Sequence, residues 1–171
     1  LATGVNCDHH LYSISIVNKM LTINGNGHFI GFADKTFGYN GGCISISSSS
    51  TVVMNDLVIK NGYTGTGYTC GGGGVGVTTS VKASGISVID SDLTLNSVSL
   101  LDHTGSAYYG YTTSHVYGGA VYLLNSNLAL NDCSFKNCVA KSGGYYTNGA
   151  NSARGGAIYS QSSHVVSNGC S

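Results

Sequence analysis

An asparagine recurs at the end of five short apolar segments, and this repeat constrains the fold more than any other feature. The segments end at Asn24, Asn55, Asn96, Asn131 and Asn168, at intervals of 31, 41, 35 and 37 residues. Apolar residues stand one and three positions before the first four asparagines, as in Leu93-Thr-Leu95-Asn96, and Gly, Asp or Ser follows all five. Alternation with a period of two, repeated every few dozen residues without a helical pattern between the copies, predicts a β-solenoid.

Two further motifs indicate three short strands in each repeat. Upstream of the asparagine, Gly118-Gly-Ala-Val-Tyr122 matches Gly155-Gly-Ala-Ile-Tyr159, and downstream apolar residues follow it by two and four positions, as in Leu57-Val-Ile59. Parallel strands stack about 4.8 Å apart, so equivalent side chains of successive coils lie over one another. We therefore expect the five asparagine amides to hydrogen-bond along the stack as a structural ladder.

The composition agrees with an all-β chain in which every strand is interior. The 171 residues include no Pro and no Glu, so helix formers are scarce and every strand residue can donate its amide to a neighbour. The length is typical of one domain. We predict a single β domain over residues 1–171, with an irregular N-terminal segment at residues 1–10.

The last third of the chain carries a sharper motif. Cys133-Ser-Phe135-Lys-Asn137-Cys-Val-Ala140 is followed, after a loop, by Gly155-Gly-Ala-Ile-Tyr159. This pattern resembles the Gly-Gly-Ala-Ile repeats of polymorphic outer-membrane proteins and of secreted surface proteins in the pectate-lyase-like superfamily. The resemblance implies a right-handed parallel β-helix of about five coils over residues 11–171. It also implies an extracellular structural or adhesive role, and it implies no reaction.

Long loops rich in Gly and Tyr are predicted on one edge of the solenoid. The resemblance implies coils shorter than these repeats, and the surplus falls near residues 33–40, 62–83, 103–117 and 141–154, always before the next Gly-Gly start. Nine of the twelve tyrosines lie there: Tyr39, Tyr63, Tyr68, Tyr108, Tyr109, Tyr111, Tyr117, Tyr145 and Tyr146. Tyrosine among Ser, Gly and Asn is typical of recognition surfaces, here for copies of the protein or for a glycan. Alternatively, the rings fold back over the flank of the solenoid.

Cys133 and Cys170 occupy the same repeat position. The spacing of adjacent strands lies within the Cα–Cα distance of about 4.4–6.8 Å that a disulfide requires, so the two are a possible disulfide; a ladder of free cysteines is the alternative. Six cysteines in a small chain with few charges favour an oxidising compartment. We therefore expect an extracellular or cell-surface location.

Charge and motif content argue against several classes of function. The formal net charge is zero, which gives no attraction to a nucleic-acid backbone, and no apolar run reaches the length of a membrane span. Asp90 and Asp92 are two residues apart, as paired carboxylates for calcium or glycoside hydrolysis would be. Their equivalents in later repeats are Asn125 with Asn127 and Ser162 with His164, which indicates a solvated turn. We expect no enzyme, no metal and no cofactor.

No capping segment is evident at either end of the predicted stack. Either the chain belongs to something longer, or a neighbouring subunit supplies the missing part of a coil, which predicts head-to-tail stacking into a filament. A neutral surface also lacks the repulsion that keeps copies apart. The leading hypothesis is an extracellular structural protein that assembles with itself, head to tail and laterally through the tyrosine loops. The alternative is an adhesin or glycan-binding module that uses the same loops.

Overall fold

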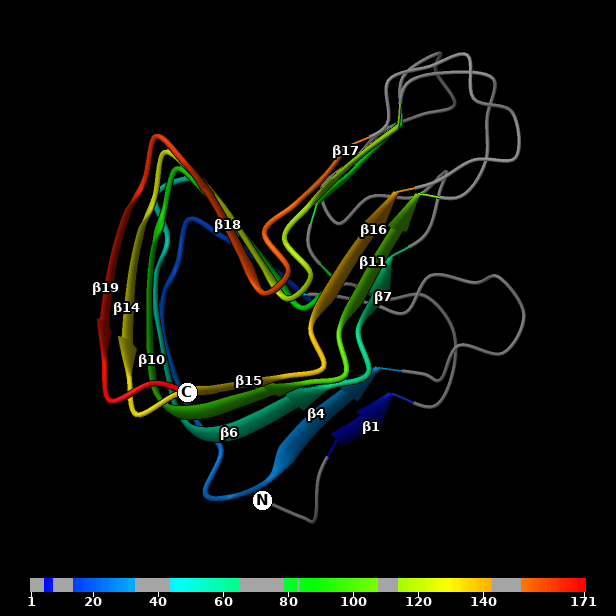
Figure 1. Cartoon of the computed structure of the whole chain (residues 1–171). Coiled ribbons are helices and arrows are strands. Elements are labelled where there is room, and N and C mark those ends of the chain that lie inside the picture. Colours follow the sequence, from blue (N-terminus) through cyan, green and yellow to red (C-terminus); the bar gives the residue numbers. More distant parts are fainter. Residues whose placement is uncertain are drawn as a thin grey trace.

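The computed structural model describes residues 5–7, 14–32, 44–64, 79–82, 84–107, 114–142 and 152–171. These residues form strands and turns and contain no helix, so the chain is all-β over the described ranges. The strands lie in four sheets, and every pairing between them is parallel. Parallel neighbours need a long connection between them, and here the strands of the other sheets provide it (Figure 1).

The largest sheet has eight strands. It contains β1 (Val5–Cys7), β3 (Met20–Asn24), β4 (Phe29–Phe32), β6 (Thr51–Lys60), β10 (Asp92–Leu101), β14 (Asn127–Asn131), β15 (Ser134–Lys136) and β19 (His164–Asn168).

A second sheet has five strands: β2 (Ile14–Val17), β5 (Ile44–Ser47), β9 (Ile86–Ile89), β13 (Val121–Leu124) and β18 (Ile158–Gln161). Two smaller sheets have three strands each. One contains β7 (Tyr63–Thr64), β11 (Thr104–Ala107) and β16 (Val139–Ser142), and the other contains β8 (Thr79–Lys82), β12 (Ser114–Tyr117) and β17 (Ser152–Arg154).

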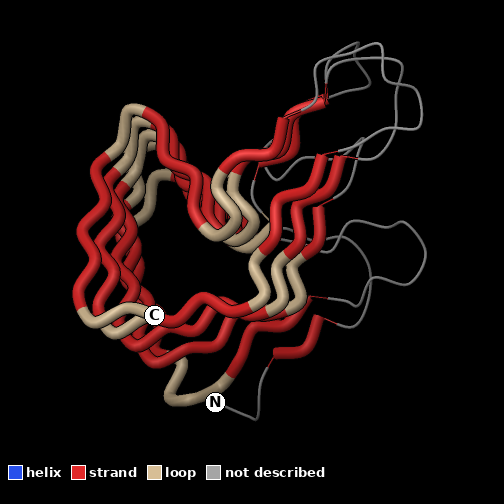
Figure 2. The backbone as a smooth tube through the Cα atoms, in the orientation of Figure 1, coloured by secondary structure: helices blue, strands red, loops and turns tan. Residues whose placement is uncertain are grey.

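The chain runs repeatedly from the five-stranded sheet to the eight-stranded sheet and, between β6 and β18, through the two small sheets before it returns. We number its passes 1 to 5 by the strand that each contributes to the five-stranded sheet, namely β2, β5, β9, β13 and β18. Neighbours in that sheet always come from consecutive passes, in the order β18-β13-β9-β5-β2. Figure 2 shows the successive passes running side by side. Residues one repeat apart in the sequence therefore become neighbours across a strand pair.

A sharp bend in the middle of the long strands keeps the apolar residues on one side. In β6, Val52, Met54, Leu57 and Ile59 are at most 4 % exposed. Strict alternation from Val52 and Met54 would turn residue 56 inward, but Asp56 has a φ of 48°, in the left-handed region. This residue resets the alternation, so Leu57 faces the core and Asp56 stays exposed. β10 repeats the bend at Ser97 and pairs with β6 in the same register before and after it.

The small sheets occupy segments that the sequence predicted as loops. Strands β7, β8, β11, β12, β16 and β17 lie wholly or partly within residues 62–83, 103–117 and 141–154. Val116 of β12 is fully buried and packs against Ala140 of β16, in a cluster separate from the main core. Residues 5–7, in the segment predicted to be irregular, form β1 against β4. The described residues include no helix long and apolar enough to span a bilayer.

Candidate functional site

The five repeated asparagines form one continuous chain of side-chain hydrogen bonds. Each amide Nδ2 donates to the Oδ1 of the previous pass: Asn55 to Asn24 at 2.7 Å, Asn96 to Asn55 at 2.8 Å, Asn131 to Asn96 at 2.8 Å and Asn168 to Asn131 at 3.1 Å. The strand register places the five residues opposite one another. The left-handed corner residue is the one after the asparagine, as at Asp132, so the asparagine itself serves the ladder. All donors point the same way, and the ladder therefore has a direction.

A second ladder, made of serines, was not predicted from the sequence. Ser50, Ser91 and Ser126 are at most 5 % exposed. The backbone N–H of each donates to the Oγ in the next pass: Ser50 to Ser91 at 3.1 Å, Ser91 to Ser126 at 3.2 Å and Ser126 to Ser163 at 3.0 Å. Each Oγ in turn donates to a nearby carbonyl of its own pass, such as Ser126 to Leu124 at 2.7 Å. The sequence signal is a serine directly after a left-handed corner residue, here Ser49, Asp90, Asn125 and Ser162.

Of the two alternatives for Cys133 and Cys170, the structure has the free cysteines and not the possible disulfide. The backbone N–H of Cys133 donates to the Sγ of Cys170 at 3.3 Å, so the two sulfurs continue the serine pattern at another corner. Side chains stacked on parallel strands keep their Cβ atoms about 4.8 Å apart, whereas a disulfide brings them to about 3.8 Å. Burial raises the pKa of the Cys133 thiol, which disfavours the reactive thiolate.

His103 is a buried titratable side chain that takes no part in the asparagine or serine ladder. It is fully buried, and its Nε2 lies 3.0 Å from the carbonyl oxygen of Ile59. A side chain at Gly62 would collide with the His103 ring, so the glycine of pass 2 makes room for the histidine of pass 3. Desolvation lowers the pKa of His103, and the neutral imidazole is therefore the favoured form.

Most of the predicted tyrosine loops lie outside the described residues: Tyr39, Tyr68, Tyr108, Tyr109, Tyr111, Tyr145 and Tyr146. The other two lie in strands, Tyr63 in β7 and Tyr117 in β12. Tyr117 belongs to an aromatic cluster, with its ring centre 4.8 Å from that of Tyr159 and 5.9 Å from that of His115. Tyr122 and Tyr159 stack across the β13–β18 pair at 5.7 Å. Tyr117 is the last residue of β12, and Tyr122 and Tyr159 pair across β13 and β18, so the cluster spans the turn between the strand pairs β12–β17 and β13–β18.

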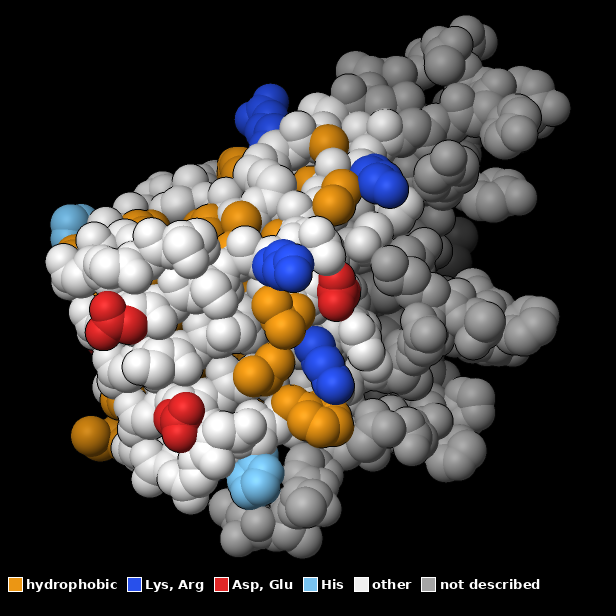
Figure 3. Space-filling model, turned by 60° about the horizontal axis from the view of Figure 1, so that its bottom comes forward, with side chains coloured by type: hydrophobic (Ala, Val, Ile, Leu, Met, Phe, Trp, Pro, Cys, Tyr) orange, Lys and Arg blue, Asp and Glu red, His pale blue; other side chains and the backbone are white. Residues whose placement is uncertain are grey.

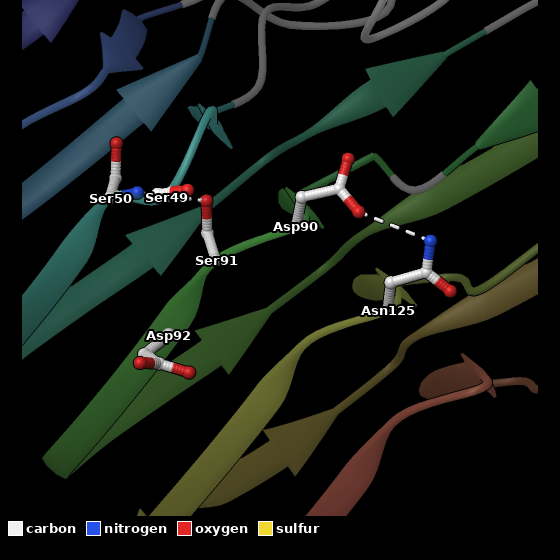
Figure 4. Close-up of a pocket in the computed structure, with 6 residues that line it drawn as sticks. All are labelled: Ser49, Ser50, Asp90, Ser91, Asp92 and Asn125. Carbon is white, nitrogen blue, oxygen red and sulfur yellow. Dashed lines mark hydrogen bonds between the residues drawn. The ribbon is translucent and has the colours of Figure 1, made fainter.

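Asp90 and Asp92 line a shallow surface pocket with Ser49, Ser50, Ser91 and Asn125 (Figure 4). Both carboxylates accept hydrogen bonds from the amides of the next pass: Asn125 donates to Asp90 at 3.1 Å and Asn127 to Asp92 at 2.7 Å. The pair therefore serves a side-chain ladder like the asparagines. Across the described ranges, no three His, Cys, Asp or Glu side chains gather closely enough to hold a metal ion.

The two ends of the stack expose apolar residues that the middle passes bury. Ile14 and Leu21 in pass 1 are 37 % and 41 % exposed, and Val165 in pass 5 is 37 % exposed. Their partners one pass inward, Ile44, Val52 and Leu128, are at most 1 % exposed. No described strand covers these end residues on the outer side.

The sides of the stack carry few charges. On the face shown in Figure 3, backbone and uncharged polar side chains cover most of the described surface, and the charged side chains are scattered. Among the exceptions, the Nζ of Lys60 lies 3.7 Å from the centre of the Phe29 ring, a cation–π contact between β6 and β4. The chain matches no protein-family model, no curated protein and no solved structure.

Proposed function

We propose that this chain is a right-handed parallel β-helix of about five coils and an extracellular structural subunit. Its copies assemble head to tail, and laterally, into a filament or surface layer. In this proposal the chain carries out no reaction and its partner is itself. The parallel register supports the β-helix, because strands of consecutive passes pair side by side in every sheet.

The exposed ends of the core carry the proposal of head-to-tail assembly. The strand register places Ile14, Leu21 and Val165 on the core-facing side. Their side chains are partly exposed because no described strand lies beyond them. Unpaired parallel strand edges accompany them, and such edges are templates for another strand. A second copy placed on either end would bury these side chains and satisfy the free backbone groups of both edges.

The contacts between passes inside the subunit are of the type that a joint between two copies would repeat. Between passes, each contact combines backbone hydrogen bonds, stacked apolar residues and side-chain amide bonds such as Asn96 to Asn55. Few charges oppose the approach of a second copy, because Lys and Arg total seven and the acidic residues also total seven. These features favour stacking over a soluble, separated subunit.

Sedimentation velocity over a dilution series, with electron microscopy of the most concentrated sample, tests the assembly. We expect species that grow with concentration, and fibres in the most concentrated sample. Leu21→Lys places a charge on the core end and should weaken growth, whereas Met20→Lys makes the same charge change on a side chain that is already 88 % exposed and should have a smaller effect. A monodisperse monomer at the highest concentration, with no fibres, would refute head-to-tail assembly.

The aromatic cluster favours a second candidate, a glycan-binding adhesin. Tyr117, Tyr159 and His115 are partly exposed, and aromatic faces suit the apolar face of a sugar ring. The chain has no Trp, so its fluorescence comes from its twelve tyrosines, which include those of the cluster. Titration with neutral oligosaccharides should change that fluorescence in the parent protein and not in Tyr159→Ala. An unchanged spectrum for every oligosaccharide tried would count against this candidate.

A further inference from the structure

We propose that two copies pack side by side through one face of the stack, related by a two-fold axis that runs parallel to the stack. We call this surface the charged face; it consists of residues 56–60, 97–101 and 132–136, in passes 2, 3 and 4. This inference rests on the proposed self-assembly and specifies its lateral contact. The contact involves neither end of the stack.

Acidic and basic side chains stand at opposite edges of the charged face. Asp56 and Asp132 are exposed at the corner where the strands bend, each with a φ near 50°. Lys60 follows the fully buried Ile59, so its side chain points away from the core, and Lys136 occupies the same position two passes later. Figure 3 turns this lower side of the molecule toward the viewer: acidic side chains lie toward its left edge, and most of the basic ones lie to their right, among apolar side chains.

Pass 3 carries no charge at these two positions. Ser97 fills its corner, and Leu101 lies in register with Lys60 on one side and with Lys136 on the other. Charges of each sign are therefore two passes apart, which is about 10 Å at the usual spacing of strands. The aspartates and the lysines belong to the same two passes, so the acidic pair and the basic pair have the same spacing and the same height along the stack.

A two-fold axis parallel to the stack brings the acidic pair of one copy onto the basic pair of the other. Val58, Ser99 and Ser134 stand midway between the corner and the lysine edge, and they lie in register with one another. Rotation by 180° about an axis outside this uncharged row reverses the strand direction and leaves each pass at its own height. Each aspartate then faces the lysine of the same pass in the other copy, across the gap of about 10 Å that separates sheets packed face to face. The contact is self-complementary and contains four ion pairs, because each copy contributes two aspartates and two lysines.

The charges of this face have no partner of opposite sign within the described residues. No ion pair joins Asp56, Asp132 or Lys136 to another described side chain. The Nζ of Lys60 lies over the Phe29 ring at 3.7 Å, a contact that orders the side chain and leaves its positive charge free for a carboxylate. A second copy therefore supplies the ion pairs that one copy lacks.

Asp102 is the acidic residue closest in sequence to the lysine edge, because it directly follows Leu101. Its carboxylate accepts a hydrogen bond from the Nδ2 of Asn137 at 2.8 Å. The edge still has two lysines for one aspartate, so it keeps an excess of positive charge. The corner edge has two aspartates and no lysine, so the two edges attract each other.

The charged face is small, which determines where the contact will be seen. Each segment extends about 13 Å along the strand and the three passes about 10 Å across it, whereas a stable dimer buries about 800 Å² on each partner. Exposed ion pairs are also weak one by one. Copies that are already joined in a row present the face repeatedly, and many weak contacts then act together. We therefore expect lateral pairing between fibres and not between single subunits.

Reversing the basic edge tests the contact. In the acidic variant, Lys60→Asp and Lys136→Asp place like charges against each other at all four contacts. Electron microscopy at low ionic strength should show paired fibres for the parent protein and single fibres for this variant. The control, Lys19→Asp with Lys141→Asp, changes the net charge equally outside the face and should keep the pairing. Salt at about 1 M should separate the parent's pairs into single fibres, because it screens exposed charges.

Reversing the acidic edge gives the complementary variant, Asp56→Lys with Asp132→Lys. This basic variant should also form single fibres, and a mixture of acidic and basic variants should pair again, because every contact then joins opposite charges. One chain with all four substitutions should pair with itself. Lysine is less suited than aspartate to a left-handed corner, so Asp56→Asn with Asp132→Asn provides a second variant that keeps the corner and removes the charge; it too should lose the paired fibres.

The outcomes separate the lateral contact from the proposed function. If the parent protein forms no assembly at all, the proposed function fails and the contact with it. If the parent forms only single fibres, if the acidic variant pairs like its control, or if the mixture stays single, the lateral contact is overturned while head-to-tail assembly stands. An unchanged circular dichroism spectrum of each variant shows that the loss of pairing does not come from unfolding.

Discussion

Replacing an asparagine in the middle of the ladder should cost about twice as much stability as replacing one at its end. Asn96 makes two ladder bonds, donating to Asn55 at 2.8 Å and accepting from Asn131 at 2.8 Å, whereas Asn24 makes one. A hydrogen bond contributes about 1 kcal/mol net, so Asn96→Ala should lower the free energy of unfolding by about 2 kcal/mol and Asn24→Ala by about 1 kcal/mol.

Urea denaturation followed by circular dichroism measures the difference, at a concentration where the protein is monomeric. With a slope of about 2 kcal/mol per M urea, the midpoint should fall by about 1 M for Asn96→Ala and about 0.5 M for Asn24→Ala. If the free energy of unfolding falls equally in the two variants, the lost stability comes from the backbone conformation at the corner and not from the side-chain hydrogen bonds of the ladder. Losses below about 0.5 kcal/mol in both would show that water replaces the amide bonds without penalty.

Three further predictions concern the interior. Desolvation lowers the pKa of His103 in the folded state, so the unfolded chain binds the proton first; stability should fall as pH drops below about 6.5, and urea midpoints of His103→Gln should lose this dependence. Ser126→Ala leaves the buried N–H of Ser91 without its acceptor and should lower the unfolding free energy by about 1–3 kcal/mol, with Ser126→Cys milder. In a thermal melt, Gly119→Ala should be far more damaging than Gly156→Ala, because a Cβ at Gly119 meets the Gly156 carbonyl, whereas one at Gly156 has its nearest contact at 3.6 Å.

The strands nearest the asparagines were predictable from the sequence because their pattern repeats. Val52 and Leu93 stand at the same distance before an asparagine, and the structure pairs them in the eight-stranded sheet. The alternation also separates buried from exposed positions, as long as a turn former marks the bend. Parallel all-β structure therefore follows from periodicity alone.

The small sheets and the serine ladder were not predictable in the same way. Strands β8, β12 and β17 are three or four residues long and lie among Gly, Ser, Thr and Tyr, so their apolar alternation is too short to distinguish from loop sequence. Serine is so frequent in this chain that Ser91 and Ser126 do not stand out, and their burial depends on where the corner turns. Likewise, the shared repeat position of Cys133 and Cys170 is evident from the sequence. The orientation of their side chains depends on the backbone geometry at the corner, which the sequence does not reveal.

The direction of the asparagine ladder makes the five amides behave as a single unit. Turning one amide by 180° would set nitrogen against nitrogen on one side and oxygen against oxygen on the other, so a single reversal breaks two bonds at an interior residue such as Asn96. Only two arrangements keep every bond, with all amides pointing toward pass 1 or all pointing toward pass 5. The ladder is thus a one-dimensional cooperative array of two-state groups, in which the orientation of the amide at one end fixes the orientation of the amide at the other.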